Sequence, residues 1–375
     1  MLYEKLTGYA ADGAYPMHMP GHKRNTNLLP PGLPYDIDVT EIHGFDDLHD
    51  PQGVLKETAE LAACLYGSER AFPLVNGSTV GVLAAIGAHT VRGDKLLTTR
   101  NCHRSVYNAA GLFGLNTVYT ELETDETSGI ACSVEPAAVE AALKNDPDIK
   151  LVAVTSPTYE GVISDIGSIS EITHRHGIPL FVDGAHGAHL DFSPAFRGGA
   201  VRAGADIVVM SLHKTLPALT QCSLLHTCGG YANVREITRL LSVLQTSSPS
   251  YVLMASIDHC LRMISSGKEK LFSEYERNLD LFDADIKPLK KLSVLCHGGD
   301  APHAGFFSFD PGKLVVVTKK TALSGMVLAD ILRAEFMVEL ELACPGYAVA
   351  MTSVCDTAAS LREFAGALCV IDRRL

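Results

Sequence analysis

The sequence lacks tryptophan, a surplus of basic residues and any long apolar run. Its 375 residues include no Trp and carry a formal net charge of −12. Without tryptophan, a role built on stacking against single-stranded bases is disfavoured, and nucleic-acid phosphates repel an acidic chain. No apolar stretch reaches the roughly 18 residues that a membrane span needs. We therefore expect neither a nucleic-acid partner nor a membrane partner.

Cysteine pairs with metal-binding or redox spacing are missing too. The ten cysteines are scattered and none forms a Cys-x-x-Cys pair, which favours free thiols over disulfides or zinc sites. The first twenty residues contain Glu4 and Asp12 and no apolar segment of the kind that secretory signal peptides carry. With 47% apolar and 20% charged residues, the composition is that of a globular protein, and we expect it to be cytoplasmic.

Short apolar strands alternate with helices through the first two thirds of the chain. Strands are expected at 71–75, 95–98, 116–119, 151–154, 180–183, 207–210 and 223–226. Helices are expected at 53–67, 80–91, from 106 onward, 133–143 and 169–176. This alternation is typical of βαβ units. It predicts an α/β fold with a mostly parallel sheet of the seven-stranded type and a small C-terminal α+β domain.

Three regions follow from the change in pattern along the chain. Residues 1–50 form an irregular, apolar-poor arm that we expect to wrap over a neighbour or a site. Residues 51–265 form the large domain, and 266–375 form a linker helix and the small domain. A long helix is expected at 249–285, with Gly267 as a candidate break. The small domain is expected to contain strands at 292–296, 305–309, 313–318 and 347–352 and helices at 324–336 and 357–371.

Polar clusters follow several of the expected strands and should therefore gather at one edge of the sheet, where ligands of open α/β sheets bind. Gly77-Ser78-Thr79 precedes a helix, which suits a phosphate, although the same pattern is common in plain helix caps. Asp183 ends one buried strand, and Ser211-Leu212-His213-Lys214 follows the next. His103 lies between a strand and a helix.

These pieces match what pyridoxal 5'-phosphate requires of a protein. The cofactor needs a lysine to form an imine with its aldehyde, a carboxylate to keep its ring nitrogen protonated, a flat side chain on its ring face and donors for its phosphate. In this sequence the lysine would be Lys214 and the carboxylate Asp183. The flat side chain would be His103, and the phosphate donors would come from Gly77-Ser78-Thr79.

Seven stretches together resemble the ornithine/lysine/arginine decarboxylase family, whose members have the aspartate-aminotransferase fold, or fold type I. They are Met19-Pro20-Gly21-His22-Lys23, Asp46-Asp47-Leu48-His49, Val75-Asn76-Gly77-Ser78-Thr79, Arg100-Asn101-Cys102-His103, Val182-Asp183-Gly184-Ala185-His186-Gly187-Ala188-His189, Ser211-Leu212-His213-Lys214-Thr215-Leu216 and Thr246-Ser247-Ser248-Pro249-Ser250-Tyr251. The sequence departs from longer members in having no N-terminal wing domain, in stopping at Leu375 and in having Gly at position 184.

The resemblance implies a role for each site residue. Lys214 would carry the cofactor, Asp183 would pair with its ring nitrogen, and His103 would stack on its ring. Gly77, Ser78, Thr79, Ser211 and His213 would surround the phosphate, and His186 would lie near the cofactor. Thr246 or Ser247 would reach the phosphate of the other subunit, which implies a homodimer with shared active sites. His103, Asp183, His213 and Lys214 are the expected catalytic residues.

Two other readings of the polar residues stay open. His186 and His189 lie three apart, as metal ligands can, but no third ligand follows at a suitable spacing, so we expect no metal. The acidic residues Glu41, Asp46 and Asp47 would either receive the distal cation of a basic substrate or form a solvated loop.

The expected function is decarboxylation of a basic amino acid, namely lysine, arginine or ornithine, to CO₂ and a di- or polyamine, as in polyamine biosynthesis. The alternative is another reaction on the same cofactor, such as transamination or aldol-type cleavage. An aminotransferase of this fold would want a small-domain arginine, but Arg333 and Arg362 lie in no obvious loop motif. A cofactor-binding regulator is a third reading, and no basic stripe supports it.

Overall fold

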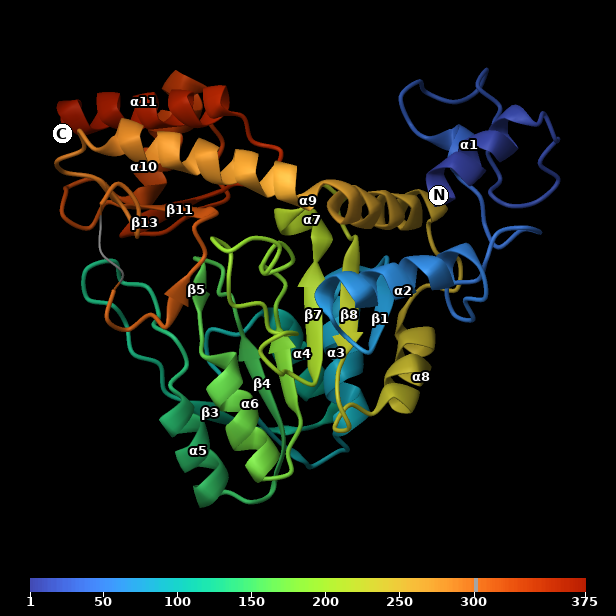
Figure 1. Cartoon of the computed structure of the whole chain (residues 1–375), viewed down its shortest axis with the longest axis horizontal. Helices are drawn as coiled ribbons and strands as arrows, with labels where there is room; N and C mark the ends of the chain where they lie inside the picture. The colour runs from blue at the N-terminus through green and yellow to red at the C-terminus, as the bar shows by residue number, and fades with distance from the viewer. Residues whose placement is uncertain (300–302) are drawn as a thin grey trace.

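A seven-stranded sheet forms the centre of the molecule (Figure 1). The computed structural model describes residues 1–299 and 303–375. The strands, in spatial order, are β1 (Arg70–Leu74), β8 (Ser223–Thr227), β7 (Ile207–Ser211), β6 (Leu180–Asp183), β4 (Ile149–Thr155), β2 (Lys95–Thr99) and β3 (Asn116–Thr120). The pairs from β7 to β3 are parallel, and β8 runs antiparallel to both of its neighbours. The predicted mostly parallel α/β fold is confirmed.

Helices cover both faces of this sheet. On one face α3 (Gly77–His89), α4 (Arg104–Phe113) and α8 (Val234–Leu244) share an apolar cluster with the strands. On the other face lie α2 (Val54–Tyr66), α5 (Pro136–Asn145) and α6 (Ile166–Arg175). Because both faces are covered, every residue of β6 and β7 is buried, which explains why these strands have no alternating pattern in the sequence.

Several helices of the large domain differ from the sequence-based expectation. Helix α5 begins at Pro136, three residues after the expected start, and α6 begins at Ile166, three residues before it. Helix α3 begins at Gly77, three residues before the expected start at Val80, so the Gly-Ser-Thr triplet is its first turn. Helix α8 was not anticipated, although its apolar residues Ile237, Leu240 and Leu241 have helical spacing and are buried. The expected helix at 53–67 is confirmed as α2, which ends at Gly67 with a φ of +80°.

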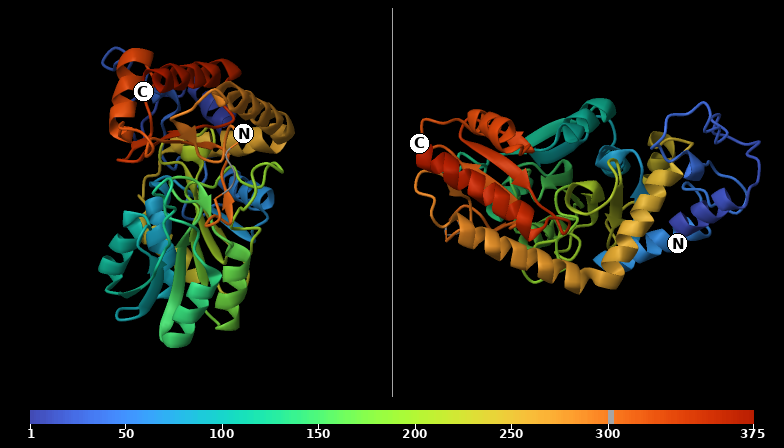
Figure 2. Two further views of the ribbon diagram at one scale, coloured as in Figure 1. Left: turned by 90° about the vertical axis from the view of Figure 1, so that its left-hand side faces the viewer. Right: turned by 90° about the horizontal axis from the view of Figure 1, so that it is seen from above.

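The long helix α9 (Tyr251–Ile286) connects the large domain to the small one. It continues through Gly267, so the suggested break there is wrong, but it changes direction along its length (Figure 2). The expected domain boundary at 265/266 falls inside this helix. Its C-terminal half packs on α11 (Ala358–Arg374).

The small domain is built on a second sheet. It contains β12 (Leu342–Ala343), β13 (Tyr347–Met351), β11 (Lys313–Val317) and β9 (Ser293–Val294), with α10 (Gly325–Phe336) packed on β13. The strand expected at 305–309 is only β10 (Ser308–Phe309), and it pairs with β5 (Val162–Ile163) of the large domain. This pairing joins the two domains beside the carboxyl end of the central sheet.

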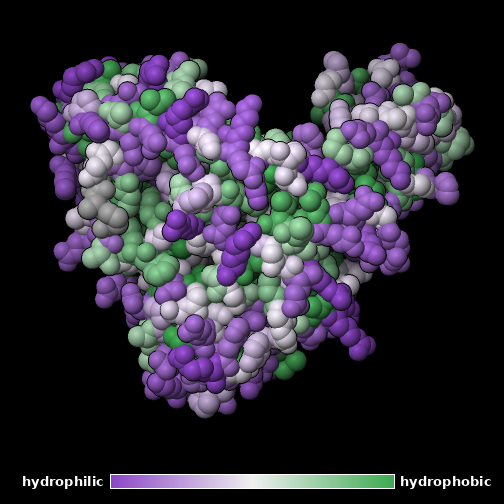
Figure 3. Space-filling view, in the orientation of Figure 1, coloured by the Kyte–Doolittle hydropathy of each residue, from purple (hydrophilic) through white to green (hydrophobic). Residues whose placement is uncertain are grey.

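The N-terminal arm, which was expected to be irregular, contains some regular structure. Residues Leu2–Ala11 form α1, and Tyr35–Ile37 form a short 3₁₀ turn. Leu2 and Leu6 are fully buried where α1 packs against α9. The arm and the small domain stand as two projections with a notch between them (Figure 3). Among the helices of the described residues, none has the length and apolar character that crossing a membrane requires.

Candidate active site

A cavity of about 350 Å³ lies at the carboxyl ends of β6 and β7, where the first turns of α3 and α4 also begin. The expected cofactor residues that line it are Gly77, Ser78, Thr79, His103, Asp183, His186, Ser211, His213 and Lys214. Residues from segments more than a hundred positions apart thus meet at one place. Thr246, Ser247 and the acidic arm residues are not part of this lining.

Lys214 lies in the one-turn helix α7 (Leu212–Thr215), directly after β7. Its Nζ atom is 3.1 Å from Nε2 of His186. Burial lowers the pKa of the Lys214 amine, while the negative charge of Asp183 opposes that shift without cancelling it. The lowered pKa increases the share of the neutral amine, which is the nucleophilic form.

Asp183 is the last residue of β6 and is only 3% exposed. Burial raises the pKa of its carboxyl group, and the Ala185 N–H, 3.2 Å from Oδ1, is its one hydrogen-bond donor among the described residues. A carboxylate taken out of water with so little compensation is costly. The site therefore has room for a cationic partner that the chain itself does not supply.

Hydroxyl groups and backbone amides meet at the start of α3. Ser78 Oγ lies 2.6 Å from Ser211 Oγ and 3.3 Å from Ser223 Oγ. The Gly77 N–H donates to the Gln221 carbonyl at 3.1 Å. The N-cap residue Asn76 makes no capping hydrogen bond with its side chain, so it leaves the next amides of the first turn to an anion. Gly77 adopts a φ of +72° at this turn, a conformation that favours glycine.

Two of the three histidines that line the cavity, His103 and His213, are each held through one ring nitrogen. His103 caps α4, with Nδ1 2.8 Å from Ser105 Oγ, and burial lowers its pKa so that the ring is neutral. His213 Nδ1 lies 2.9 Å from the carbonyl oxygen of Cys222, and burial lowers its pKa as well. Both rings keep Nε2 for a ligand.

Sequence reasoning missed the contribution of the small domain. Lys313, the first residue of β11, is 1% exposed and places Nζ 2.9 Å from Nδ1 of His186. Tyr159 packs its ring on His186 at 4.6 Å between centroids. A lysine at the start of an entirely buried strand is the only hint that the sequence offered, since the contact spans 127 positions.

His189 does not act with His186 on a common ligand. Its Nε2 atom pairs with Oδ1 of Asp310 at 3.0 Å, and both side chains are almost fully buried. His186 and His189 thus each contact the small domain through a different partner.

The acidic residues of the arm lie outside the cavity. The Asp46 carboxylate accepts hydrogen bonds from the backbone N–H groups of Asp47, Gln52, Gly53 and Leu55. Partial burial works against ionisation, but these amides outweigh it and lower the pKa of Asp46. Asp46 therefore anchors the start of α2, and its carboxylate has little capacity left for a substrate cation. A substrate role for Glu41 and Asp47 stays a prediction.

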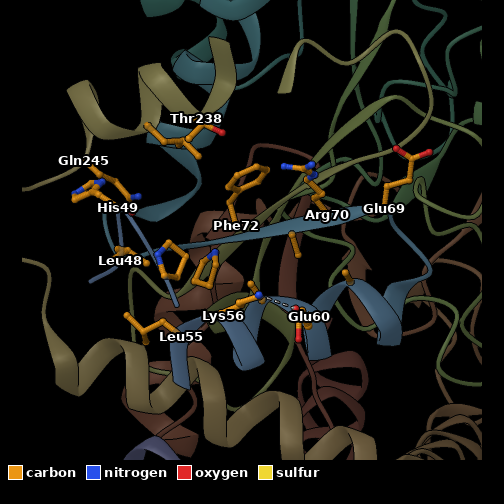
Figure 4. Close-up of a pocket in the computed structure, with 16 residues that line it drawn as sticks. Leu48, His49, Leu55, Lys56, Glu60, Glu69, Arg70, Phe72, Thr238 and Gln245 are labelled. Carbon is orange, nitrogen blue, oxygen red and sulfur yellow. Dashed lines mark ion pairs between the residues drawn. The ribbon is translucent and has the colours of Figure 1, made fainter. Parts of the chain in front are cut away.

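A second hollow of about 460 Å³ lies between α2, β1 and α8 (Figure 4), and Lys214 is not part of its lining. Lys56 and Glu60 form an ion pair on its α2 side, and His49 and Gln245 lie at one end (Figure 4). His49 also reaches the carbonyl oxygen of Thr246 at 2.9 Å. None of the expected cofactor residues lines this hollow.

Comparison with known proteins agrees with the family resemblance seen in the sequence. Residues 1–284 match the family model described as Orn/Lys/Arg decarboxylase, major domain. The chain is 39% identical over 350 residues to the uncharacterized protein YaaO of Bacillus subtilis (strain 168), covering 90% of this chain and 71% of YaaO. It is 32% identical over 349 residues to an arginine decarboxylase of the same organism, covering 91% of this chain and 71% of that protein.

The fold is shared with solved structures. The lysine decarboxylase LdcF of Francisella novicida superimposes with a TM-score of 0.84 at 19% identity. The match covers 99% of this chain and 60% of LdcF, so the chain spans well under two thirds of that structure.

Proposed function

The chain belongs to the Orn/Lys/Arg decarboxylase family, and from that premise we propose that it decarboxylates a basic amino acid with pyridoxal phosphate carried on Lys214. The main structural support for this proposal is that Lys214, Asp183 and the first turn of α3 surround one cavity. The proposed substrate is lysine, arginine or ornithine. CO₂ and the corresponding amine are the proposed products.

The residues present fit pyridoxal phosphate. Asp183 is a buried carboxylate without a cation, and a protonated ring nitrogen would supply one. The hydroxyls of Ser78 and Ser211 and the uncapped amides of α3 suit a phosphate dianion. His103 would hold the ring face, and His213 would add a phosphate donor through Nε2.

When bound, the cofactor supplies an aldehyde that links to amines and a protonated ring that accepts the electron pair left by departing CO₂. The chain's own groups prepare the site for this. Burial lowers the pKa of the Lys214 amine, which favours its bonding to carbon, and a protonated ring nitrogen would stabilise the negative charge of Asp183 that burial alone disfavours. His186 stands 3.1 Å from the Lys214 amine as a nearby proton carrier.

Acidic groups near the cavity support a cationic substrate. Glu341 of the small domain accepts a hydrogen bond from Tyr159, which lines the cavity, and Glu160 accepts one from Tyr347 at 2.8 Å. The charge of Glu341 also acts on the Lys214 amine. A distal ammonium or guanidinium group would be attracted to these carboxylates.

The positions of the small-domain arginines support decarboxylation over transamination. Arg333 pairs with Asp330 and Glu339, and Arg362 lies 3.7 Å from Asp285, with both guanidinium groups exposed. These arginines are used at the surface, so neither is placed to hold a substrate α-carboxylate.

We also propose a homodimer in which Thr246 or Ser247 completes the partner's phosphate site. Thr246 lies outside its own chain's cavity and beside the arm through His49. The arm exposes large apolar side chains, with Tyr15, Met17 and Leu28 at 73%, 84% and 81%. A second copy that covers them would remove this apolar surface from water.

The decisive experiment incubates the purified protein with pyridoxal phosphate and each basic amino acid and measures CO₂ and amine. We expect amine from at least one substrate and an imine absorbance band that disappears in Lys214→Ala but persists in the surface control Lys270→Ala. Cofactor bound through Lys214 with no amine from any basic amino acid would contradict the proposed reaction.

Subunit mixing tests the shared site. Lys214→Ala and the double variant Thr246→Ala, Ser247→Ala should each be impaired, and their mixture should regain activity because mixed dimers contain one intact site. Mixing Lys214→Ala with Asp183→Asn is the control, since both defects lie in the same chain's cavity and no intact site can form. Equal behaviour of the two mixtures would refute sharing.

A further inference from the structure

Two side-chain contacts join the loop after β6 to the small domain, and the contacting residues have the same sequence spacing on both sides. His186 meets Lys313 at 2.9 Å, and His189 meets Asp310 at 3.0 Å, so residues three apart on one side face residues three apart on the other. Asp310 is fixed further, because its N–H donates to the Gly161 carbonyl at 2.8 Å and its carboxylate accepts from the Gly312 N–H at 2.8 Å. Lys313 is therefore held rigidly against His186.

The chemistry of the three side chains restricts where the imidazole proton lies. A charged lysine has only donors and no acceptor. His186 is neutral, because burial first and the neighbouring lysines second hold its pKa well below the usual range. A neutral imidazole has one N–H and one lone pair. If Nδ1 accepts from Lys313, the ring proton must be on Nε2, which is the nitrogen 3.1 Å from Lys214.

We propose that Lys313 is a positioning residue that fixes His186 in the Nε2–H tautomer, so that His186 directs its N–H at the Lys214 amine. This inference rests on the proposed function for its importance to catalysis, but not for its geometry. In the described residues, His186 is the one hydrogen-bond partner of the Lys214 amine. The small domain thereby influences the reactive lysine through one imidazole.

The surroundings of Lys313 keep it charged near neutral pH. Burial lowers its pKa, nearby carboxylates oppose that shift, and the net value is about 8. The titratable groups that act on it are Asp310, Lys214, Glu341 and Glu160. The Tyr159 ring adds a further favourable contact, with its centroid 6.0 Å from Nζ. Above this pKa the neutral amine could accept a hydrogen bond, and the constraint on His186 would relax.

The test is ¹⁵N NMR of the imidazole nitrogens in histidine-labelled full-length protein, with the His186 signals assigned by their loss in His186→Gln. We expect Nδ1 unprotonated and Nε2 protonated at pH 7, with or without pyridoxal phosphate. Raising the pH through about 8 should populate the Nδ1–H form. This titration uses the unmodified chain, so it decides the question even if a variant fails to fold.

Variants at position 313 sharpen the result. Lys313→Met should give a mixed tautomer and lower kcat about tenfold or more, and removing the like charge should raise the pKa of the cofactor imine by about one unit. Lys313→Arg should keep the Nε2–H form at all accessible pH values, because a guanidinium remains charged. Lys319→Met, at an exposed position after the same strand, is the matched charge control and should change none of these quantities.

An Nδ1–H tautomer in the wild type at pH 7, a doubly protonated ring, or an unchanged tautomer in folded Lys313→Met would each overturn the proposal. The outcome is separable from the proposed function. A protein that forms no imine with pyridoxal phosphate would refute the cofactor assignment, while the tautomer of His186 in the cofactor-free chain would still confirm or refute the role of Lys313.

Discussion

Ser78 Oγ lies 2.6 Å from Ser211 Oγ, which joins the first turn of α3 to the end of β7 across 133 positions of sequence. The contact brings a helix N-terminus, two hydroxyls and the segment that carries Lys214 to one point. Each hydroxyl has a lone pair and a proton, so the pair can donate to an anion while keeping its mutual hydrogen bond. Phosphate binding by these hydroxyls can therefore be tested separately from the chemistry at Lys214.

Ser211→Ala should weaken binding of pyridoxal phosphate about tenfold to a hundredfold. Hydrogen bonds to a charged group contribute about 1.5–3 kcal/mol, which corresponds to that range. The measurement is a fluorescence titration of the cofactor-free protein, with the exposed residue change Ser266→Ala as control. An affinity equal to that of the wild type would remove Ser211 from the phosphate site.

Asp183→Asn should lower kcat about a hundredfold and weaken cofactor binding, because an amide removes the charge that a protonated ring nitrogen requires. Since burial raises the pKa of Asp183 in the cofactor-free chain, protons compete with the cofactor at acidic pH. The wild-type affinity should therefore decline as the pH falls, whereas the affinity of the variant should lack this decline.

The control variant for Asp183→Asn is Asp148→Asn. The side chain of Asp148 is 77% exposed and is not part of the cavity lining. This variant should retain both the affinity and its pH dependence. An Asp183→Asn protein that binds the cofactor with unchanged affinity and the same pH dependence would show that this carboxylate does not face the ring nitrogen.

Residues that follow buried strands could be found from the sequence. Asp183 and Lys214 each adjoin an apolar run whose strand character is plain, and the carboxyl ends of parallel strands necessarily share an edge. Gly77-Ser78-Thr79 could be placed for the same reason, although the helix starts at Gly77 itself. Local pattern and topology were sufficient for this half of the site.

Features that depend on distant partners could not be found this way. Helix α1 has a buried face because it packs against α9, whose Asp258, 256 positions after Leu2, accepts a hydrogen bond from the Leu2 N–H. Lys313 looks like the polar start of an ordinary strand until β10 pairs with β5 and brings the domains together. Helix α8 is different, because the helical spacing of its apolar residues Ile237, Leu240 and Leu241 is already present in the sequence.

Asp258→Ala should destabilise the protein by about 3 kcal/mol and release the N-terminal arm. Asp258 is fully buried and accepts hydrogen bonds from the Leu2 N–H, from Thr58 Oγ1 at 3.0 Å and from Arg262 Nε at 2.8 Å. Truncation leaves these donors without their acceptor, which carries the desolvation cost of each.

Urea unfolding and limited proteolysis of the arm measure this change together. Arg262→Ala should cost less, about 1 kcal/mol, because the Arg262 side chain is 32% exposed and leaves the other two hydrogen bonds intact. Equal unfolding midpoints and equal protection of the arm in Asp258→Ala and wild type would contradict the assigned role.

Stability should also fall with acidification through His226, which is fully buried in β8. Its Nδ1 atom lies 2.9 Å from Ser68 Oγ, and its Nε2 atom has no hydrogen-bond partner among the described residues. Burial lowers the pKa of His226 to about 3, against about 6.5 in an unfolded chain. Between these two pH values the unfolded state binds a proton that the folded state does not. The contribution of His226 to the free energy of unfolding is therefore constant above about pH 6.5 and decreases as the pH falls toward 3.

The expected slope from this one group is about 1.4 kcal/mol per pH unit within that window. His226→Leu removes the titration while filling the apolar site, so the difference in unfolding free energy between variant and wild type should change with this slope as the pH is lowered. Urea unfolding at a series of pH values measures it. Parallel pH profiles for the two proteins would mean that His226 becomes protonated within the folded state at no cost, and the buried, half-partnered imidazole would then not limit acid stability.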